Sequence, residues 1–143
     1  MSILIDENTK LIIQGITGRE GTFHGERMIA YGTKVVGGVT PGKGGQNVFG
    51  IPVFDTVKQA YEETGANTTV LFVPARFTAE GAYEAIDAKI PLVITIAEHV
   101  PVHDMMKVYN LARKSDSIVV GPNSFGIISP GRSKAGFMHD KIF

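Results

Sequence analysis

The sequence of 143 residues contains no cysteine. This absence excludes disulfide bonds, a thiolate nucleophile and cysteine metal ligands, and it is typical of proteins from a reducing compartment. There is also no excess of charge of either sign, because 14 basic residues balance 14 acidic ones. The overall charge therefore favours neither nucleic acid nor a membrane surface as a partner, and any anion site has to be local.

Long apolar runs are missing as well. No stretch reaches the roughly 20 residues that a membrane-spanning helix needs. The first residues, 1–6, show no basic region followed by a long apolar one. We therefore expect a protein of the cytoplasm, or of the mitochondrial matrix in a eukaryote. The length suits a single domain, residues 1–143, with a core of ordinary size.

The chain does contain a repeated alternation of short β-branched runs and longer amphipathic segments. Strands are predicted at 10–14, 34–39, 52–54, 69–73, 92–96 and 118–120. Helices are predicted at 20–31, 56–63, 78–88 and 102–114, the second with Asp55 as its N-cap and Gly65 at its end. The glycine-rich segment 37–50 is expected to be a loop. This order predicts a doubly wound α/β fold: a mostly parallel sheet with helices on both faces and right-handed crossovers.

A glycine turn, Gly15-Ile16-Thr17-Gly18-Arg19-Glu20-Gly21, follows the first predicted strand and opens the first helix. Glycines allow a sharp turn and close approach of a ligand, and the N–H groups of a helix start attract phosphate. Further loops follow the other strands at 40–45, 74–77, 97–99 and 121–126. Each loop alone could be an ordinary turn that only connects two elements. Because all five lie at the carboxyl ends of parallel strands, we expect them to form one ligand-binding crevice.

The loop after the second strand bears on the choice of cofactor. A nicotinamide site carries an acidic residue about 20 residues beyond the glycine turn, which binds the ribose hydroxyls. Val36-Gly37-Gly38-Val39 offers no carboxylate, and Lys43 follows among glycines. A lysine there favours a phosphorylated nucleotide. The alternative is a solvated surface lysine without a ligand.

Several motifs carry a specific resemblance: the glycine turn 15–21, Tyr31-Gly32-Thr33, Thr40-Pro41-Gly42-Lys43-Gly44-Gly45, Gly50-Ile51-Pro52-Val53-Phe54 and Gly121-Pro122-Asn123. With them the chain resembles, along its whole length, the coenzyme A-binding domain of the succinyl-CoA synthetase alpha subunit. The resemblance implies a Rossmann-like domain with coenzyme A as its cofactor.

The same resemblance implies a role in an acid-CoA ligase, which joins a carboxylic acid to coenzyme A at the expense of ATP or GTP. The chain corresponds to the N-terminal half of the alpha subunit. The phosphorylated histidine of the family then lies in a following domain, beyond residue 143, and the nucleotide site on a partner beta subunit. We therefore expect no catalytic residue in this chain, and no activity of the chain alone.

Ten residues are expected to bind coenzyme A by this resemblance: Thr17, Gly18, Arg19 and Glu20 in the glycine turn, Lys43 on the adenosine half, Val73 and Pro74 flanking the ligand, and Ile96, Ala97 and Glu98 lining it. The chain departs from the family pattern at Arg76, at His99 and at Ser124-Phe125. These positions lie where the thiol or the acid would approach, so the acid can be succinate or another one such as malate.

The four histidines are expected in different surroundings. His24 is expected on a helix face, His103 in the first turn of the last helix and His139 near the end of the chain, whereas His99 beside Glu98 could touch ligand. The spacing of the histidines and carboxylates predicts no metal site. Two further functions stay open: a stand-alone regulatory module that binds coenzyme A, and a nicotinamide-dependent oxidoreductase.

Overall fold

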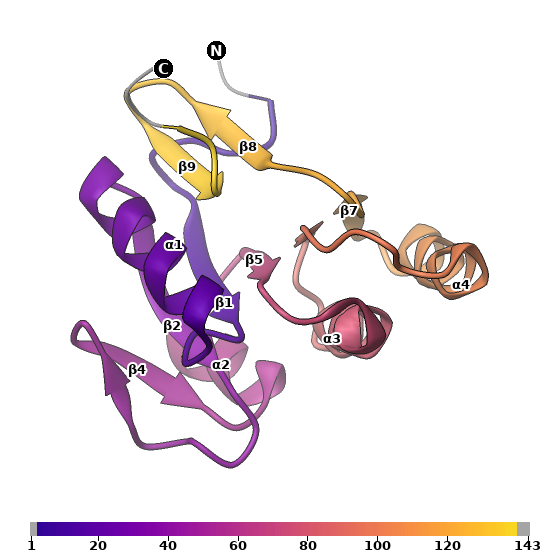
Figure 1. Cartoon of the computed structure of the whole chain (residues 1–143), viewed down its shortest axis with the longest axis horizontal. Helices are drawn as coiled ribbons and strands as arrows, with labels where there is room; N and C mark the ends of the chain where they lie inside the picture. Colours follow the sequence, from indigo (N-terminus) through magenta and orange to yellow (C-terminus); the bar gives the residue numbers. More distant parts are fainter. Residues whose placement is uncertain (1–2, 140–143) are drawn as a thin grey trace.

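A twisted seven-stranded sheet forms the centre of the computed structural model, which describes residues 3–139 (Figure 1). Its strands are β1 (Lys10–Gln14), β2 (Lys34–Val39), β3 (Asn47–Val48), β4 (Ile51–Phe54), β5 (Thr68–Leu71), β6 (Leu92–Thr95) and β7 (Ile118–Val120). Their order across the sheet is β3-β4-β2-β1-β5-β6-β7. All neighbours are parallel except the short β3, which is antiparallel to β4. The predicted doubly wound α/β fold is confirmed.

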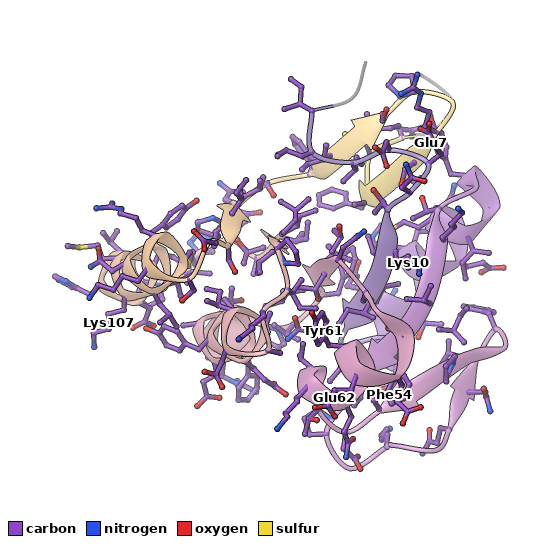
Figure 2. All side chains as sticks on the ribbon, turned by 180° about the vertical axis from the view of Figure 1, so that it is seen from behind. Glu7, Lys10, Phe54, Tyr61, Glu62 and Lys107 are labelled. Carbon is purple, nitrogen blue, oxygen red and sulfur yellow. The ribbon has the colours of Figure 1, made fainter. Side chains whose placement is uncertain are left out.

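Four helices connect the strands: α1 (Arg19–Tyr31), α2 (Val57–Thr64), α3 (Ala75–Asp87) and α4 (Val102–Lys114). The alternation of side chains along β1 decides which face each helix covers. Ile12 packs into a core with residues of α2, α3 and α4, whereas Ile13 packs on the other face with Met28 of α1. The helices are amphipathic in turn: on α4, Lys107 points outward (Figure 2), and its neighbour Val108 is fully buried.

A β-hairpin completes the face that α1 covers (Figure 1). It consists of β8 (Gly126–Ser129) and β9 (Ser133–Gly136), and it was not predicted. Thr33, after α1, fixes the hairpin by donating from Oγ1 to the Lys134 carbonyl at 2.7 Å and accepting from the Lys134 N–H at 2.8 Å. All four residues of β9 are buried and all four of β8 half-buried. Neither strand therefore shows the period-2 alternation by which a strand is recognised.

Two further boundaries differ from the prediction. The segment 37–50 is not one loop: residues 37–39 belong to β2, as the strand predicted at 34–39 required, and β3 forms at Asn47–Val48. Helix α3 begins at Ala75, directly after Pro74, so the predicted loop 74–77 is mostly its first turn. Proline is well tolerated at a helix start, where its missing N–H has no acceptor to lose.

The prediction for the start of α2 was wrong. The N-cap is Thr56, whose Oγ1 accepts a hydrogen bond from the Gln59 N–H at 3.1 Å. Asp55, one residue earlier, accepts instead from the backbone N–H groups of Gly42 and Gly44. At the other end, Gly65 stops the helix in the left-handed conformation, as predicted. Along residues 3–139, no helix combines the length and the apolar character needed to cross a membrane.

Candidate functional site

The strand order changes direction between β1 and β5. From β1 the chain runs through β2 to β4 on one side, and then continues through β5, β6 and β7 on the other. Crevices for ligands form at the carboxyl ends of the strands flanking such a switch point. A cavity of about 660 Å³ opens there. It is lined by Gly18, Arg19, Glu20, His24, Leu71, Phe72, Val73, Pro74, Ile96, Ala97, Glu98, Asn123, Ser124, Phe125 and Phe137.

Two glycines allow the turn between β1 and α1 to pass close to β5. Gly15 has a positive φ of 85°, and a Cβ atom there would lie 2.4 Å from the Phe72 carbonyl oxygen. A Cβ atom on Gly21 would lie 2.1 Å from the Gly15 carbonyl oxygen. Only residues without a side chain fit these contacts, so the glycine spacing brings the start of α1 to the wall of the cavity.

The cavity meets the N-termini of two helices. Gly18 precedes α1 and Pro74 precedes α3; both line the cavity, and neither provides a side-chain cap. The first N–H groups of a helix have no acceptor within the helix, and they carry a partial positive charge. Of the other two helices, α2 is capped by Thr56, and α4, which also lacks a side-chain cap, does not begin at this cavity. The cavity can therefore accept an anionic group such as a phosphate.

Aromatic rings line one part of the cavity. We call His24, Phe72, Phe125 and Phe137 the aromatic lobe. The His24 ring stacks on Phe72 with centroids 5.3 Å apart and an angle of 18°, and it also lies 5.3 Å from Phe137. Phe125 meets Phe137 edge to face at 5.3 Å. The lobe offers an apolar surface in the same cavity as the two helix N-termini.

His24 also contacts the charged rim of the cavity. Its Nε2 lies 3.1 Å from Oε2 of Glu20, one turn earlier on α1. Burial lowers the pKa of His24 below its usual value, against the opposing effect of Glu20. The prediction placed His24 on a helix face without a part in the site. The i, i+4 spacing from Glu20 was the signal in the sequence that would have linked it to the site.

Eight of the ten predicted site residues line this one cavity: Gly18, Arg19, Glu20, Val73, Pro74, Ile96, Ala97 and Glu98. Thr17 does not, and its hydroxyl instead donates to the Thr40 hydroxyl at 3.0 Å, which connects the first two loops. Thr40 lines a second cavity of about 340 Å³, which shares Val73 and Pro74 with the first. The second cavity extends the site towards the loop of Lys43.

Lys43 itself lines neither cavity and is exposed. His99, suspected of contacting ligand, is also outside both, with its side chain 91% exposed. Arg76 lies over the ring of Phe77, 4.8 Å from its centroid. Of the positions where the chain departs from the family pattern, only Ser124 and Phe125 reach the first cavity.

A glycine turn, an uncapped helix start and a cavity at the switch point of a doubly wound sheet define a Rossmann-like domain for a phosphate-bearing cofactor. Residues 6–99 match the family model described as the CoA binding domain. The chain belongs to this family, which confirms coenzyme A as the predicted cofactor.

Named relatives confirm the predicted resemblance. The chain is 52% identical over 143 residues to the succinate-CoA ligase [ADP-forming] subunit alpha 1 of Archaeoglobus fulgidus, covering 100% of this chain and 49% of the relative. It is 53% identical over 147 residues to the malate-CoA ligase subunit alpha of Methylorubrum extorquens, covering 100% and 50%. The chain thus spans about half the length of the curated relatives it matches.

A solved structure shows the same fold. ATP citrate lyase from Methanothrix soehngenii, in complex with citrate and coenzyme A, superposes with a TM-score of 0.80 at 26% identity. The match covers 94% of this chain and 24% of that one. The Rossmann-like arrangement is therefore shared with a domain of a much longer protein.

Proposed function

We propose that the cavity at the β1/β5 switch point is the coenzyme A site of this domain. The observation that carries the proposal is the convergence of two uncapped helix starts, at Gly18 and Pro74, on one cavity with an aromatic lobe. Coenzyme A has matching parts: anionic phosphates for the helix starts, and a long pantetheine arm whose methyl and methylene groups can pack on the aromatic lobe. A cavity of about 660 Å³ is of the usual size for a cofactor site.

We infer the direction of the ligand from the loops on either side of the helix start. The diphosphate lies against the first N–H groups of α1, with the backbone of Arg19 and Glu20 contributing. The adenosine half extends through the cavity of Thr40 towards Lys43, whose charge faces the 3′-phosphate. The pantetheine arm passes residues 96–98 and ends near Ser124 and Phe125. The absence of a carboxylate at the end of β2 leaves a nicotinamide ribose without its usual acceptor.

We further propose that the chain is the coenzyme A-binding part of the alpha subunit of an acid-CoA ligase. Its identity of more than 50% to such subunits supports this, with succinate or malate as the acid. The thiol of coenzyme A is itself the nucleophile, so the domain has to bind and orient it. In this proposal a beta subunit supplies the nucleotide site, and a second domain of the alpha subunit supplies the phosphorylated histidine.

Calorimetric titration tests the site. The chain is titrated with coenzyme A, with dephospho-coenzyme A and with NADH. We expect coenzyme A to bind most tightly, dephospho-coenzyme A more weakly and NADH least. NADH binding as tightly as coenzyme A would contradict the assignment. Ser124→Trp, which fills the end of the cavity, should weaken coenzyme A, whereas the outward-facing Lys107→Ala should not.

A further inference from the structure

The first turn of α1 contains one acidic residue, Glu20, and it lines the cavity. A carboxylate there is stabilised by the same helix N-terminus that binds a phosphate. It therefore competes with an anionic ligand for the N–H groups, and it also repels the ligand's charge. A site for a diphosphate works better if this carboxylate is held elsewhere.

His24 holds it one turn further along the helix. Its Nε2 lies 3.1 Å from Oε2 of Glu20, while the Glu20 side chain is 69% exposed and otherwise open to solvent. The imidazole ring is only 15% exposed, because it is packed between Phe72, Phe137 and Phe23. A buried ring therefore holds an exposed carboxylate.

The contacts of the ring also decide which nitrogen donates. Nδ1 of His24 is buried and has no partner among the described residues, whereas Nε2 faces the carboxylate. A proton on Nε2 gives the pair a donor and an acceptor, and it leaves no buried N–H group unsatisfied. In this tautomer the ring donates to Glu20 without carrying a charge of its own.

We propose that His24 is a positioning residue that draws the Glu20 carboxylate away from the N-terminus of α1, so that the first N–H groups of the helix stay available for the phosphates of coenzyme A. The inference rests on the proposed coenzyme A site. It assigns to the aromatic lobe a second role, that of supporting the anion-binding end of the cavity.

The main test is a double-mutant cycle with coenzyme A titrated at low ionic strength. His24→Phe keeps a ring of similar size in the lobe but removes the donor. We expect this variant to bind coenzyme A about 5- to 10-fold more weakly, the scale of one helix-terminus charge interaction. His24→Phe combined with Glu20→Gln should recover most of the lost affinity, since no carboxylate remains to compete. The deficit of His24→Phe should also shrink with added salt.

Pantetheine, which has no phosphate, separates positioning from packing. The His24→Phe variant should lose clearly less affinity for pantetheine than for coenzyme A, because the hydrogen bond between His24 and Glu20 acts on the anion site, whereas the packing of the ring affects both ligands. An equal loss for pantetheine and coenzyme A, or no recovery in the double variant, would show that His24 only packs the lobe. If the unmodified chain binds no coenzyme A, the proposed site itself is wrong.

A second pair of variants leaves the lobe intact, so it remains informative if His24→Phe does not fold. Glu20→Asp keeps the charge in the first turn but is one methylene shorter and does not reach Nε2. Glu20→Gln removes the charge at nearly constant size. We expect Glu20→Asp to bind coenzyme A several-fold more weakly than Glu20→Gln. Equal affinities of these two variants would overturn the inference.

Discussion

Oδ1 of Asp55 accepts a hydrogen bond from the backbone N–H of Gly44 at 2.9 Å. The same atom accepts from the N–H of Gly42, also at 2.9 Å. Lys43 lies between these two glycines, so the carboxylate at the end of β4 fixes the turn that presents it. A residue that the sequence suggested as a helix cap thus supports the loop of a proposed ligand-binding lysine.

We predict that Asp55→Ala weakens coenzyme A binding about 3- to 10-fold, since two charge-assisted hydrogen bonds that order the Lys43 loop are lost. Asp55→Asn is the matched control, because its amide oxygen can still accept both bonds while the negative charge is removed. Titration calorimetry should place Asp55→Asn close to the unmodified chain. Equal losses in the two variants would point to the charge and not to the fixed loop.

The lysine itself gives a second prediction. Lys43→Ala should cost about 1 to 3 kcal/mol of coenzyme A binding free energy, the scale of a charge-assisted hydrogen bond to phosphate. The loss should be smaller with dephospho-coenzyme A, which lacks the 3′-phosphate. Lys107→Ala, a lysine pointing outward from α4 (Figure 2), serves as the control. The same loss with both ligands would mean that Lys43 does not recognise the 3′-phosphate.

The glycine turn makes a prediction for stability. A Cβ atom on Gly21 would lie 2.1 Å from the Gly15 carbonyl oxygen, and backbone cannot move away as a side chain can. Gly21→Ala should therefore lower the free energy of unfolding by about 1 to 3 kcal/mol, measured by urea denaturation. Gly18→Ala is the comparison, because its Cβ atom would meet nothing closer than 3.3 Å. A smaller loss for Gly21→Ala than for Gly18→Ala would contradict the geometry.

The sequence predicted the sheet, and the edge at which the cavity opens, because both follow from patterns along the chain. Runs such as 11–13 and 92–96 are rich in apolar, β-branched residues, and glycines mark the turn that follows the first of them. The hairpin of β8 and β9 was missed for the opposite reason. Its burial depends on contacts between residues that are 101 positions apart in the sequence, such as Thr33 and Lys134. Such contacts produce no periodic pattern of apolar residues along the chain.

The prediction also missed part of the lining of the cavity. The lining residues in the loops after the strands were anticipated because topology alone places them at one edge. Phe137 reaches the cavity from beyond β9, and no local pattern indicates this. Asp55 was misassigned, since Asp55 and Thr56 are both good N-cap residues and only the backbone geometry decides between them. Residue preferences alone do not locate a helix N-cap where two adjacent residues are both suited to that position.

The buried imidazole makes stability depend on pH. Burial lowers the pKa of His24 in the folded chain, with Arg27 and Lys134 acting in the same direction and Glu20 against it. The unfolded chain then binds a proton more readily, so His24 contributes stability above its usual pKa of about 6.5, and this contribution is lost as the pH falls below it. Urea denaturation at pH 7.5 and 5.5 should show a larger acid-induced loss for the unmodified chain than for His24→Phe. Parallel losses would show that other groups cause the pH dependence.

The last prediction concerns catalysis. The chain alone should form no acyl-CoA from succinate, coenzyme A and ATP, and it should take up no phosphate on histidine. Phosphoryl transfer needs a positioned nucleophile, a cation and groups that stabilise the developing charge. None of the four histidines has such surroundings in the described structure. His24 contacts Glu20 and His99 contacts Glu98, while His99, His103 and His139 are exposed and do not line the first cavity.

Incubation with radiolabelled ATP, with and without a beta subunit of the family, measures both activities. Acid-labile label on any of the four histidines would place a phosphorylated nucleophile within residues 1–143, and the proposed division into a binding domain and a catalytic domain would be wrong. His24→Phe, His99→Ala, His103→Ala and His139→Ala would then identify the labelled residue. Without label, addition of the second alpha-subunit domain and a beta subunit from a relative should restore acyl-CoA formation, because the thiol that this domain orients is the only nucleophile it has to supply.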